Sequence, residues 1–138
     1  MMAKGQTFLS EEEKTSKGPI RHLNVIITEP TEDMSYLVVP VTTYREDDNG
    51  RPIPGQDDSC ILAANCHSFI KHKSYVHYKY ARQMSALEIV AGIHKGLLIK
   101  KEDMDPVIIQ DMQRGAEESP NLPEELTRFL QFFLTGAE

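Results

Sequence analysis

Cations, histidines and tyrosines follow one another in the segment from His67 to Arg82, and no acidic residue interrupts them. Cations attract phosphate groups and exposed rings stack on unpaired bases, so this segment predicts an interface for single-stranded RNA. The residues that we expect to contact RNA are Lys71, Lys73, Ser74, Tyr75, His77, Lys79 and Arg82. The whole chain is acidic, with a formal net charge of -6, which argues against indiscriminate binding elsewhere. A solvated strand edge that lysines protect from aggregation is the alternative explanation.

Candidate metal ligands lie in and beside the same segment. Enough donors for a zinc ion are present, but their spacing is not that of a familiar zinc motif. These donors are Cys60, Cys66, His67, His72 and His77. The chain has no phosphate-binding Walker loop and no dinucleotide fingerprint. We therefore expect no metal and no other cofactor, and we expect both cysteines to be free thiols.

Length and composition restrict the class of protein. With 138 residues, of which 40% are hydrophobic and 26% charged, the chain suits one globular domain, alone or with a helical appendage. The N-terminal residues lack an apolar run of signal-peptide length, and no segment approaches the roughly 20 apolar residues that cross a bilayer. We expect a cytoplasmic protein that makes no membrane contact.

The elements that must position the basic segment change character near residue 82. Before it, short apolar runs rich in β-branched residues predict strands, and the longest polar loop covers residues 45–58. The expected strands cover residues 7–9, 22–28, 36–41, 59–64 and 74–80. Pro40 has no N–H to donate, so we expect it at a sheet edge or a bulge. The pattern favours one twisted barrel closed by residues 5–82.

After residue 82 the apolar period becomes helical. A first stripe starts at Met84, and residues 97–99 follow it as a possible last strand. Asp105 predicts the N-cap of a second helix, which Gly115 would close. We expect a third helix over residues 123–134, with Gly136 as its stop signal. This helix carries an apolar stripe that includes Phe133 and Leu134. This stripe predicts packing on the barrel, with a dimer seam or a docking surface as alternatives. The expected fold class is mainly β with helices (α+β).

Three of the strand segments, taken together, resemble the strand motifs of the MazF/PemK-like toxins. They are GPIRHLNVIIT at 18–28, YLVVPVTTY at 36–44 and KSYVHYKYARQMS at 73–85, in the order of that family and at about its spacing. The resemblance covers residues 4–85. It implies a small SH3-like twisted β-barrel over residues 1–100, with residues 101–138 as a helical extension packed on the barrel. It also implies a homodimer that cleaves single-stranded RNA without a metal ion and is paired with an antitoxin.

The resemblance also implies roles for single residues. In such a site the ribose 2′-hydroxyl attacks the neighbouring phosphate, Arg21 stabilises the developing charge, and Thr42 positions the phosphate. Ser74 matches a serine of the third motif. His22 and His67 can both supply acid–base chemistry near neutral pH. His22 alternates to the face opposite Arg21 in a regular strand, so His67 is our candidate for proton transfer. Arg21 begins one strand, and Thr42 ends the strand that we expect to pair with it in antiparallel orientation. We therefore expect the two side chains to meet at one concave site.

A non-catalytic protein on the same barrel is the second hypothesis. The family usually has a proline after its arginine, where this chain has His22. A barrel without cleavage activity would keep the basic segment and the C-terminal helix as surfaces. These surfaces would engage RNA or a protein partner, for example in conflict between phage and host.

Overall fold

Strands and helices combine in a mixed α+β fold. The computed structural model describes residues 2–135, without the side chains of residues 132–135. The strands are β1 (Thr7–Leu9), β2 (Glu13–Thr15), β3 (Gly18–Ile20), β4 (Leu23–Ile26), β5 (Ser35–Thr43), β6 (Ile61–Leu62), β7 (Ser74–Val76), β8 (Arg82–Ser85) and β9 (Ile99–Lys101). The helices are α1 (Ala86–His94), α2 (Pro106–Glu118) and α3 (Thr127–Thr135), with 3-10 turns η1 (Tyr78–Tyr80) and η2 (Glu124–Leu126). The predicted α+β class is therefore confirmed. The predicted helix stop at Gly136 lies outside the described residues, and the predicted apolar stripe at Phe133 and Leu134 lies outside the described side chains.

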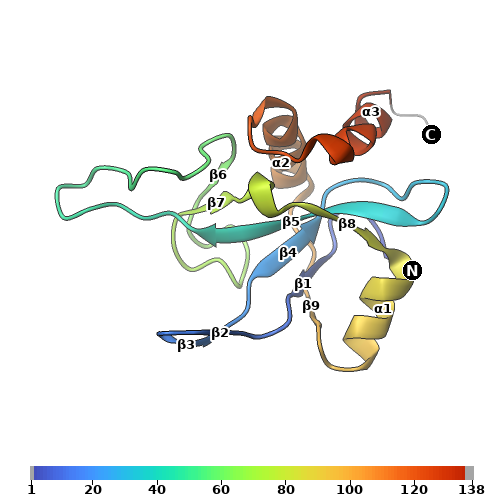
Figure 1. Cartoon of the computed structure of the whole chain (residues 1–138), viewed down its shortest axis with the longest axis horizontal. Helices are drawn as coiled ribbons and strands as arrows, with labels where there is room; N and C mark the ends of the chain where they lie inside the picture. Colours follow the sequence, from blue (N-terminus) through green and yellow to red (C-terminus); the bar gives the residue numbers. More distant parts are fainter. Residues whose placement is uncertain (1, 136–138) are drawn as a thin grey trace.

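Most strands form one antiparallel sheet, with the order β6-β7-β5-β4-β1-β9 (Figure 1). β8 pairs with the edge of β5 that faces away from β4, next to β7. Pro40 lies on β5 between these two partner strands, where its missing N–H interrupts no ladder, and its carbonyl accepts a hydrogen bond from the His77 N–H (2.9 Å). Pro40 thus lies on a central strand, at the position between the segments of β5 that pair with β7 and with β8. It does not lie at an outer edge of the sheet.

Strand alternation divides the side chains between the two faces of the sheet. In β4, Leu23 and Val25 enter one hydrophobic core, whereas Ile26 enters the other core together with Phe8 of β1. α2 and α3 cover the first face, and α1 covers the second (Figure 1). The first core draws on strands and on the C-terminal helices alike, including Leu37, Val39, Val76, Ile109, Met112 and Phe129. The predicted domain boundary after residue 100 falls inside β9.

Tyr78 and Gly115 explain how α2 docks on the sheet. The chain leaves β7 and turns through η1, which buries Tyr78 and lets its hydroxyl donate a hydrogen bond to the Met112 carbonyl (2.5 Å). A Cβ on Gly115 would meet the Tyr78 hydroxyl and would lie 2.9 Å from Cys60 Cβ. Gly115 therefore allows close packing inside α2, and our expectation that it ends the helix was wrong. The expected strand over 74–80 likewise ends at Val76, because Tyr78 is needed in the core.

The start of α1 also differs from the expectation. Met84 belongs to β8, where it pairs with Tyr36, and the helix begins one residue after Ser85. Ser85 and Glu88 form a reciprocal capping box, in which each side chain accepts a hydrogen bond from the other residue's backbone N–H. The cap sets the start of α1 at Ala86. The apolar stripe that starts at Met84 therefore covers the end of a strand and the helix that follows it.

The strand ladders among the described residues leave the sheet open, because none of them joins β6 to β9. Side chains connect the segments that follow these two outer strands. His67 lies 2.9 Å through Nε2 from the Glu102 carbonyl oxygen, and the Ser68 hydroxyl donates to the Glu102 carboxylate. The closed barrel stays a prediction, whereas this contact holds the two ends of the sheet together.

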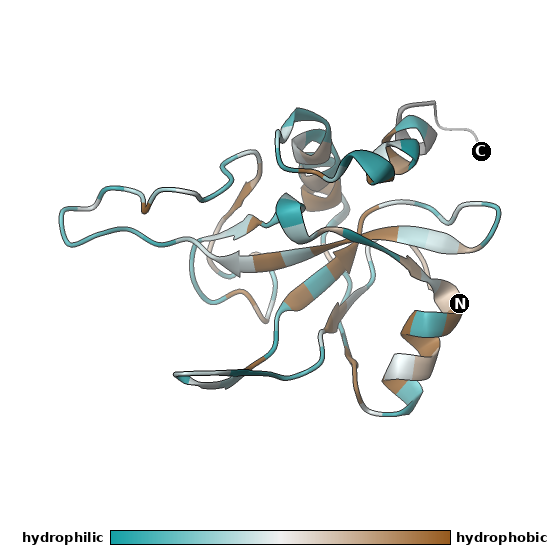
Figure 2. Ribbon diagram, in the orientation of Figure 1, coloured by the Kyte–Doolittle hydropathy of each residue, from teal (hydrophilic) through white to brown (hydrophobic). Residues whose placement is uncertain are grey.

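Two segments that project from the sheet are polar. The β2–β3 hairpin and the loop over residues 44–60 project from the sheet and are mainly hydrophilic (Figure 2). Among the described residues, none of the helices has the length and apolarity that a membrane crossing would require.

Candidate nucleic-acid interface

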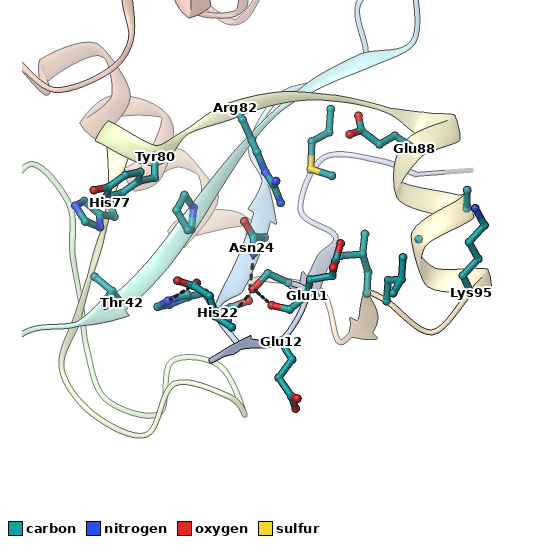
Figure 3. Close-up of a pocket in the computed structure, with 18 residues that line it drawn as sticks. Glu11, Glu12, His22, Asn24, Thr42, His77, Tyr80, Arg82, Glu88 and Lys95 are labelled. Atoms are coloured by element: carbon teal, nitrogen blue, oxygen red, sulfur yellow. Dashed lines mark hydrogen bonds and ion pairs between the residues drawn. The ribbon is translucent and has the colours of Figure 1, made fainter. Parts of the chain in front are cut away.

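A cleft of about 1030 Å³ opens on the face of the sheet that carries α1 (Figure 3). The sheet supplies its floor, η1 and β8 supply one wall, and the segment before β2 together with α1 supplies the other. The lining includes Glu11, Glu12, Glu13, His22, Asn24, Thr42, His77, Tyr80, Arg82, Glu88 and Lys95. Thr42, His77 and Arg82 are the predicted site residues that the structure brings to this cleft.

The register of β4 against β5 explains which side chains form the floor. Asn24 pairs with Pro40, so both side chains lie on the same face of the sheet. Because side chains alternate along a strand, His22 and Thr42 point to that face as well, and all four residues line the cleft.

Four rings form a chain of contacts that leads into the cleft, and we call them the aromatic strip: Tyr44, Tyr75, His77 and Tyr80. The ring centroids of Tyr44 and Tyr75 lie 6.3 Å apart, those of Tyr75 and His77 5.4 Å, and those of His77 and Tyr80 4.5 Å. Two of these contacts are edge-to-face, which leaves ring faces uncovered by the neighbouring ring. Tyr75 is buried and supports the others, whereas Tyr80 is 58% exposed.

Cations flank the aromatic strip. Lys73 Nζ lies 4.3 Å from the centroid of the Tyr44 ring, and Lys79 Nζ lies 5.8 Å from that of Tyr80. Arg82 lines the cleft beside the end of the strip, and Lys71 is exposed on the loop before β7. None of these four cations forms an ion pair within the described part of the chain. They are therefore available to an anionic ligand.

The opposite wall of the cleft is acidic. Glu11, Glu12 and Glu13 follow one another, with Glu13 as the first residue of β2. Glu13 lies 3.8 Å from Nε2 of His22, and Glu88 is engaged in the capping box of α1. The cleft therefore has a basic, aromatic wall that faces a mainly acidic wall, among whose lining residues Lys95 is a cation.

The surroundings of His77 favour the neutral form of its imidazole. Burial lowers the pKa of its imidazole below the ordinary value, and the charge of Lys79 acts in the same direction against the opposing effect of Asp57. Neither ring nitrogen makes a hydrogen bond to another described residue. At neutral pH the ring is uncharged and one nitrogen is free to accept a proton.

Arg21 does not line this cleft, although its partners Ser10 and Leu97 do. Its guanidinium donates hydrogen bonds to the backbone carbonyls of Ser10 (3.0 Å) and Leu97 (3.1 Å), and it is absent from the lining of the cleft. Strand alternation gives the reason, because His22, and not Arg21, shares a face with Thr42. The expectation that Arg21 and Thr42 meet at one concave site is not met, and a catalytic role of Arg21 stays a prediction.

His67 and Ser74 serve the architecture. His67 is buried between the two ends of the sheet, where Nδ1 accepts a hydrogen bond from the Phe69 N–H (3.1 Å) and Nε2 lies 2.9 Å from the Glu102 carbonyl oxygen. Both ring nitrogens are occupied, and His67 does not line the cleft. Ser74 is buried on β7, and its hydroxyl donates to the His72 carbonyl (2.8 Å). The structure brings neither residue to the cleft.

The cysteines do not join the neighbouring histidines in a metal site. Both thiols are free, and burial raises the pKa of Cys60 to about 11 and also raises the pKa of Cys66. In the part of the chain that the structure describes, no group of three or more His, Cys, Asp or Glu side chains is arranged to hold a metal ion.

No protein-family model, curated protein or solved structure matches this chain.

The sequence reasoning preferred His67 to His22 and left Asn24 and Tyr80 out of the site. The signal for His22 and Asn24 was present, because pairing residues 22–28 with residues 36–43 turns the even-numbered side chains of both strands to one face. Tyr80 was assigned to a regular strand, and its position depends on η1, which the burial of Tyr78 imposes.

Proposed function

We propose that the protein binds single-stranded RNA along the aromatic strip and into the cleft. The observation that carries this proposal is the continuous chain of ring contacts from Tyr44 to Tyr80, flanked by cations that have no acidic partner. Unpaired bases stack on exposed rings, and Lys or Arg side chains hold the phosphates between them. Double-stranded RNA would keep its bases stacked on one another and leave the rings unused, so we expect a preference for single strands.

The first prediction concerns the cations. Replacing Lys71, Lys73, Lys79 and Arg82 with glutamine should weaken binding of a single-stranded RNA and reduce the slope of log K against log salt by roughly one unit for each lost phosphate contact. Fluorescence anisotropy at several salt concentrations measures both quantities. The matched control replaces four exposed cations outside the strip, Lys17, Arg51, Lys100 and Arg114. Equal slopes for both quadruple variants and the wild type would contradict the proposed interface.

Cleavage of the bound RNA is the second candidate function. It agrees with the resemblance to the MazF/PemK-like toxins, which implies a metal-independent endoribonuclease, an SH3-like barrel, a homodimer and an antitoxin in the cytoplasm. One observation favours it, namely that His22, His77, Thr42 and Arg82 line the same cleft. His77 would take the proton of the 2′-hydroxyl, O2′ would attack phosphorus, and the bond to O5′ would break as His22 donates a proton to the leaving oxygen. The products would be a 2′,3′-cyclic phosphate and a 5′-hydroxyl.

The second prediction separates cleavage from binding. Incubation of labelled single-stranded RNA with the protein and a chelator should yield 2′,3′-cyclic phosphate ends, and His77→Ala should lower the rate at least about a hundredfold, as expected for loss of a general base. His94→Ala, an exposed histidine on α1, is the matched control. Arg21→Ala should cleave at the wild-type rate if His77 and Arg82 carry the chemistry. RNA that stays intact while it binds would leave the protein as a non-catalytic RNA-binding protein.

A further inference from the structure

The carboxylates on the acidic wall of the cleft are unsuited to holding phosphates, because like charges repel. The carboxylates of Glu11 and Glu12 make no hydrogen bond or ion pair with any other described residue, yet both line the cleft. Phosphate groups would be repelled by this wall and would stay on the side of Lys79 and Arg82. A nucleotide held there would turn its base, not its phosphate, toward the carboxylates.

Asn24 adds an acceptor to the floor of the same cleft. The residue is 3% exposed, on β4 between β1 and β5. Nδ2 donates a hydrogen bond to the His22 carbonyl (3.1 Å), which fixes the orientation of the amide. Oδ1 makes no hydrogen bond among the described residues. Every side-chain oxygen or nitrogen of the described residues that is fully buried has a partner, so Asn24 Oδ1 must be accessible from the cleft. Figure 3 shows Asn24 between Arg82 and the pair His22 and Glu11.

Asn24 Oδ1 and the carboxylates of Glu11 and Glu12 are hydrogen-bond acceptors on this side of the cleft, which also carries the ammonium group of Lys95. A base that pairs with these acceptors must present donors. Among the four RNA bases, only guanine carries two adjacent donors, N1–H and the 2-amino group, on its Watson–Crick edge. A carboxylate accepts both at once, with the two-point geometry of an arginine–carboxylate pair. Adenine and cytosine show one amino group beside an acceptor nitrogen, and uracil shows one N–H between two carbonyls. An unpaired base exposes this edge in full.

We propose that the cleft selects guanine. The carboxylates of the Glu11–Glu13 segment and Asn24 Oδ1 accept the donors on the Watson–Crick edge of one unpaired guanine, which rests against the rings of His77 and Tyr80. The proposal rests on the proposed RNA binding, and it assigns to the acidic wall the choice of base.

The third prediction is a comparison of bases. We would measure, by fluorescence anisotropy at one salt concentration, binding of a short oligouridine that carries guanosine, inosine or adenosine at its central position. Inosine lacks only the 2-amino group of guanosine. The guanosine oligonucleotide should bind about tenfold more tightly than the inosine one, because a hydrogen bond to a charged acceptor is lost, and adenosine should bind most weakly.

Variants locate the selection on the acidic wall. Glu11→Gln, Glu12→Gln and Glu13→Gln combined should reduce the preference for guanosine over inosine to within about threefold, even if total affinity rises as negative charge is removed. The control combines Glu117→Gln, Glu118→Gln and Glu125→Gln, which removes the same charge elsewhere and should keep the tenfold preference. Equal binding of guanosine and inosine by the wild type would overturn guanine selection and leave RNA binding standing. An unchanged preference in the Glu11–Glu13 variant would also overturn it. Absence of binding to every oligonucleotide would overturn the proposed function itself.

Discussion

Gly115 shows how one residue can serve packing at the expense of helix propensity. In the interior of α2 an alanine would favour the helix by about 1 kcal/mol. At this position, however, its Cβ would lie 2.9 Å from Cys60 Cβ and 3.0 Å from the Ser59 carbonyl oxygen, in addition to meeting the Tyr78 hydroxyl. Tyr78 cannot retreat without breaking its hydrogen bond to the Met112 carbonyl. The steric effect should therefore dominate.

The fourth prediction follows at this scale. Gly115→Ala should lower the free energy of unfolding by about 1–3 kcal/mol, as measured by urea denaturation followed by circular dichroism. Glu117→Ala, an exposed position on the same helix, should change it by less than about 0.5 kcal/mol. A more stable Gly115→Ala protein would mean that propensity prevails and that α2 can move away from η1.

At the scale of elements, Asp57 fastens the long loop between β5 and β6 to the end of α2. Its carboxylate accepts hydrogen bonds from the Ser59 N–H (2.9 Å), the Ser119 hydroxyl (2.6 Å) and the Asn121 side-chain amide (3.1 Å). Burial alone would raise the pKa of Asp57, but the hydrogen bonds from Ser119, Ser59 and Asn121 outweigh it, so the pKa lies below the ordinary value. The charged form is therefore the one that the fold stabilises.

This gives the fifth prediction, on the pH dependence of stability. A lowered pKa in the folded state adds stability above the ordinary pKa of an aspartate, about 3.9, and the contribution is lost as the pH falls through the folded-state value. Asp57→Asn should lower the free energy of unfolding by about 1–2 kcal/mol at pH 7, and the difference from the wild type should shrink as the pH falls below 4. Urea denaturation of both proteins at pH 7 and below pH 4 measures this difference in the free energy of unfolding. Asp58→Asn, the exposed neighbour, should show no such narrowing.

The elements themselves differ in how far the sequence predicts them. The strands around residues 23–26 and 35–43, the N-cap at Asp105 and the helical C-terminal segment were predicted, because each depends on local periodicity or capping chemistry. The ends of β7 and α2 were not, since burial of Tyr78 and the approach of Gly115 decide them. The S-x-x-E signature at Ser85 and Glu88 was available and would have placed the start of α1 correctly.

At the scale of the whole molecule, the expected antiparallel pairing of β4 and β5 is confirmed, but the composition of the site depended on strand parity. The predicted meeting of Arg21 and Thr42 used the strand ends at which they lie. It did not compare the faces of the sheet to which the two side chains point. His67 was judged by its chemistry near neutral pH, whereas its hydrogen bonds at the meeting ends of the sheet depend on the three-dimensional fold. Charge patterning found the basic wall of the cleft, and the acidic wall came from a distant part of the chain that no local pattern connects to it.

η1 connects two strands that both pair with β5, and this affects the free energy of any binding at the cleft. This turn is held at both ends, because β7 before it and β8 after it pair with the same strand, and the hydroxyl of its first residue, Tyr78, anchors it to α2. His77 and Tyr80 therefore stand on backbone that is already ordered in the free protein. Preorganised rings lose little further conformational entropy when a ligand stacks on them, so more of the stacking free energy appears as affinity.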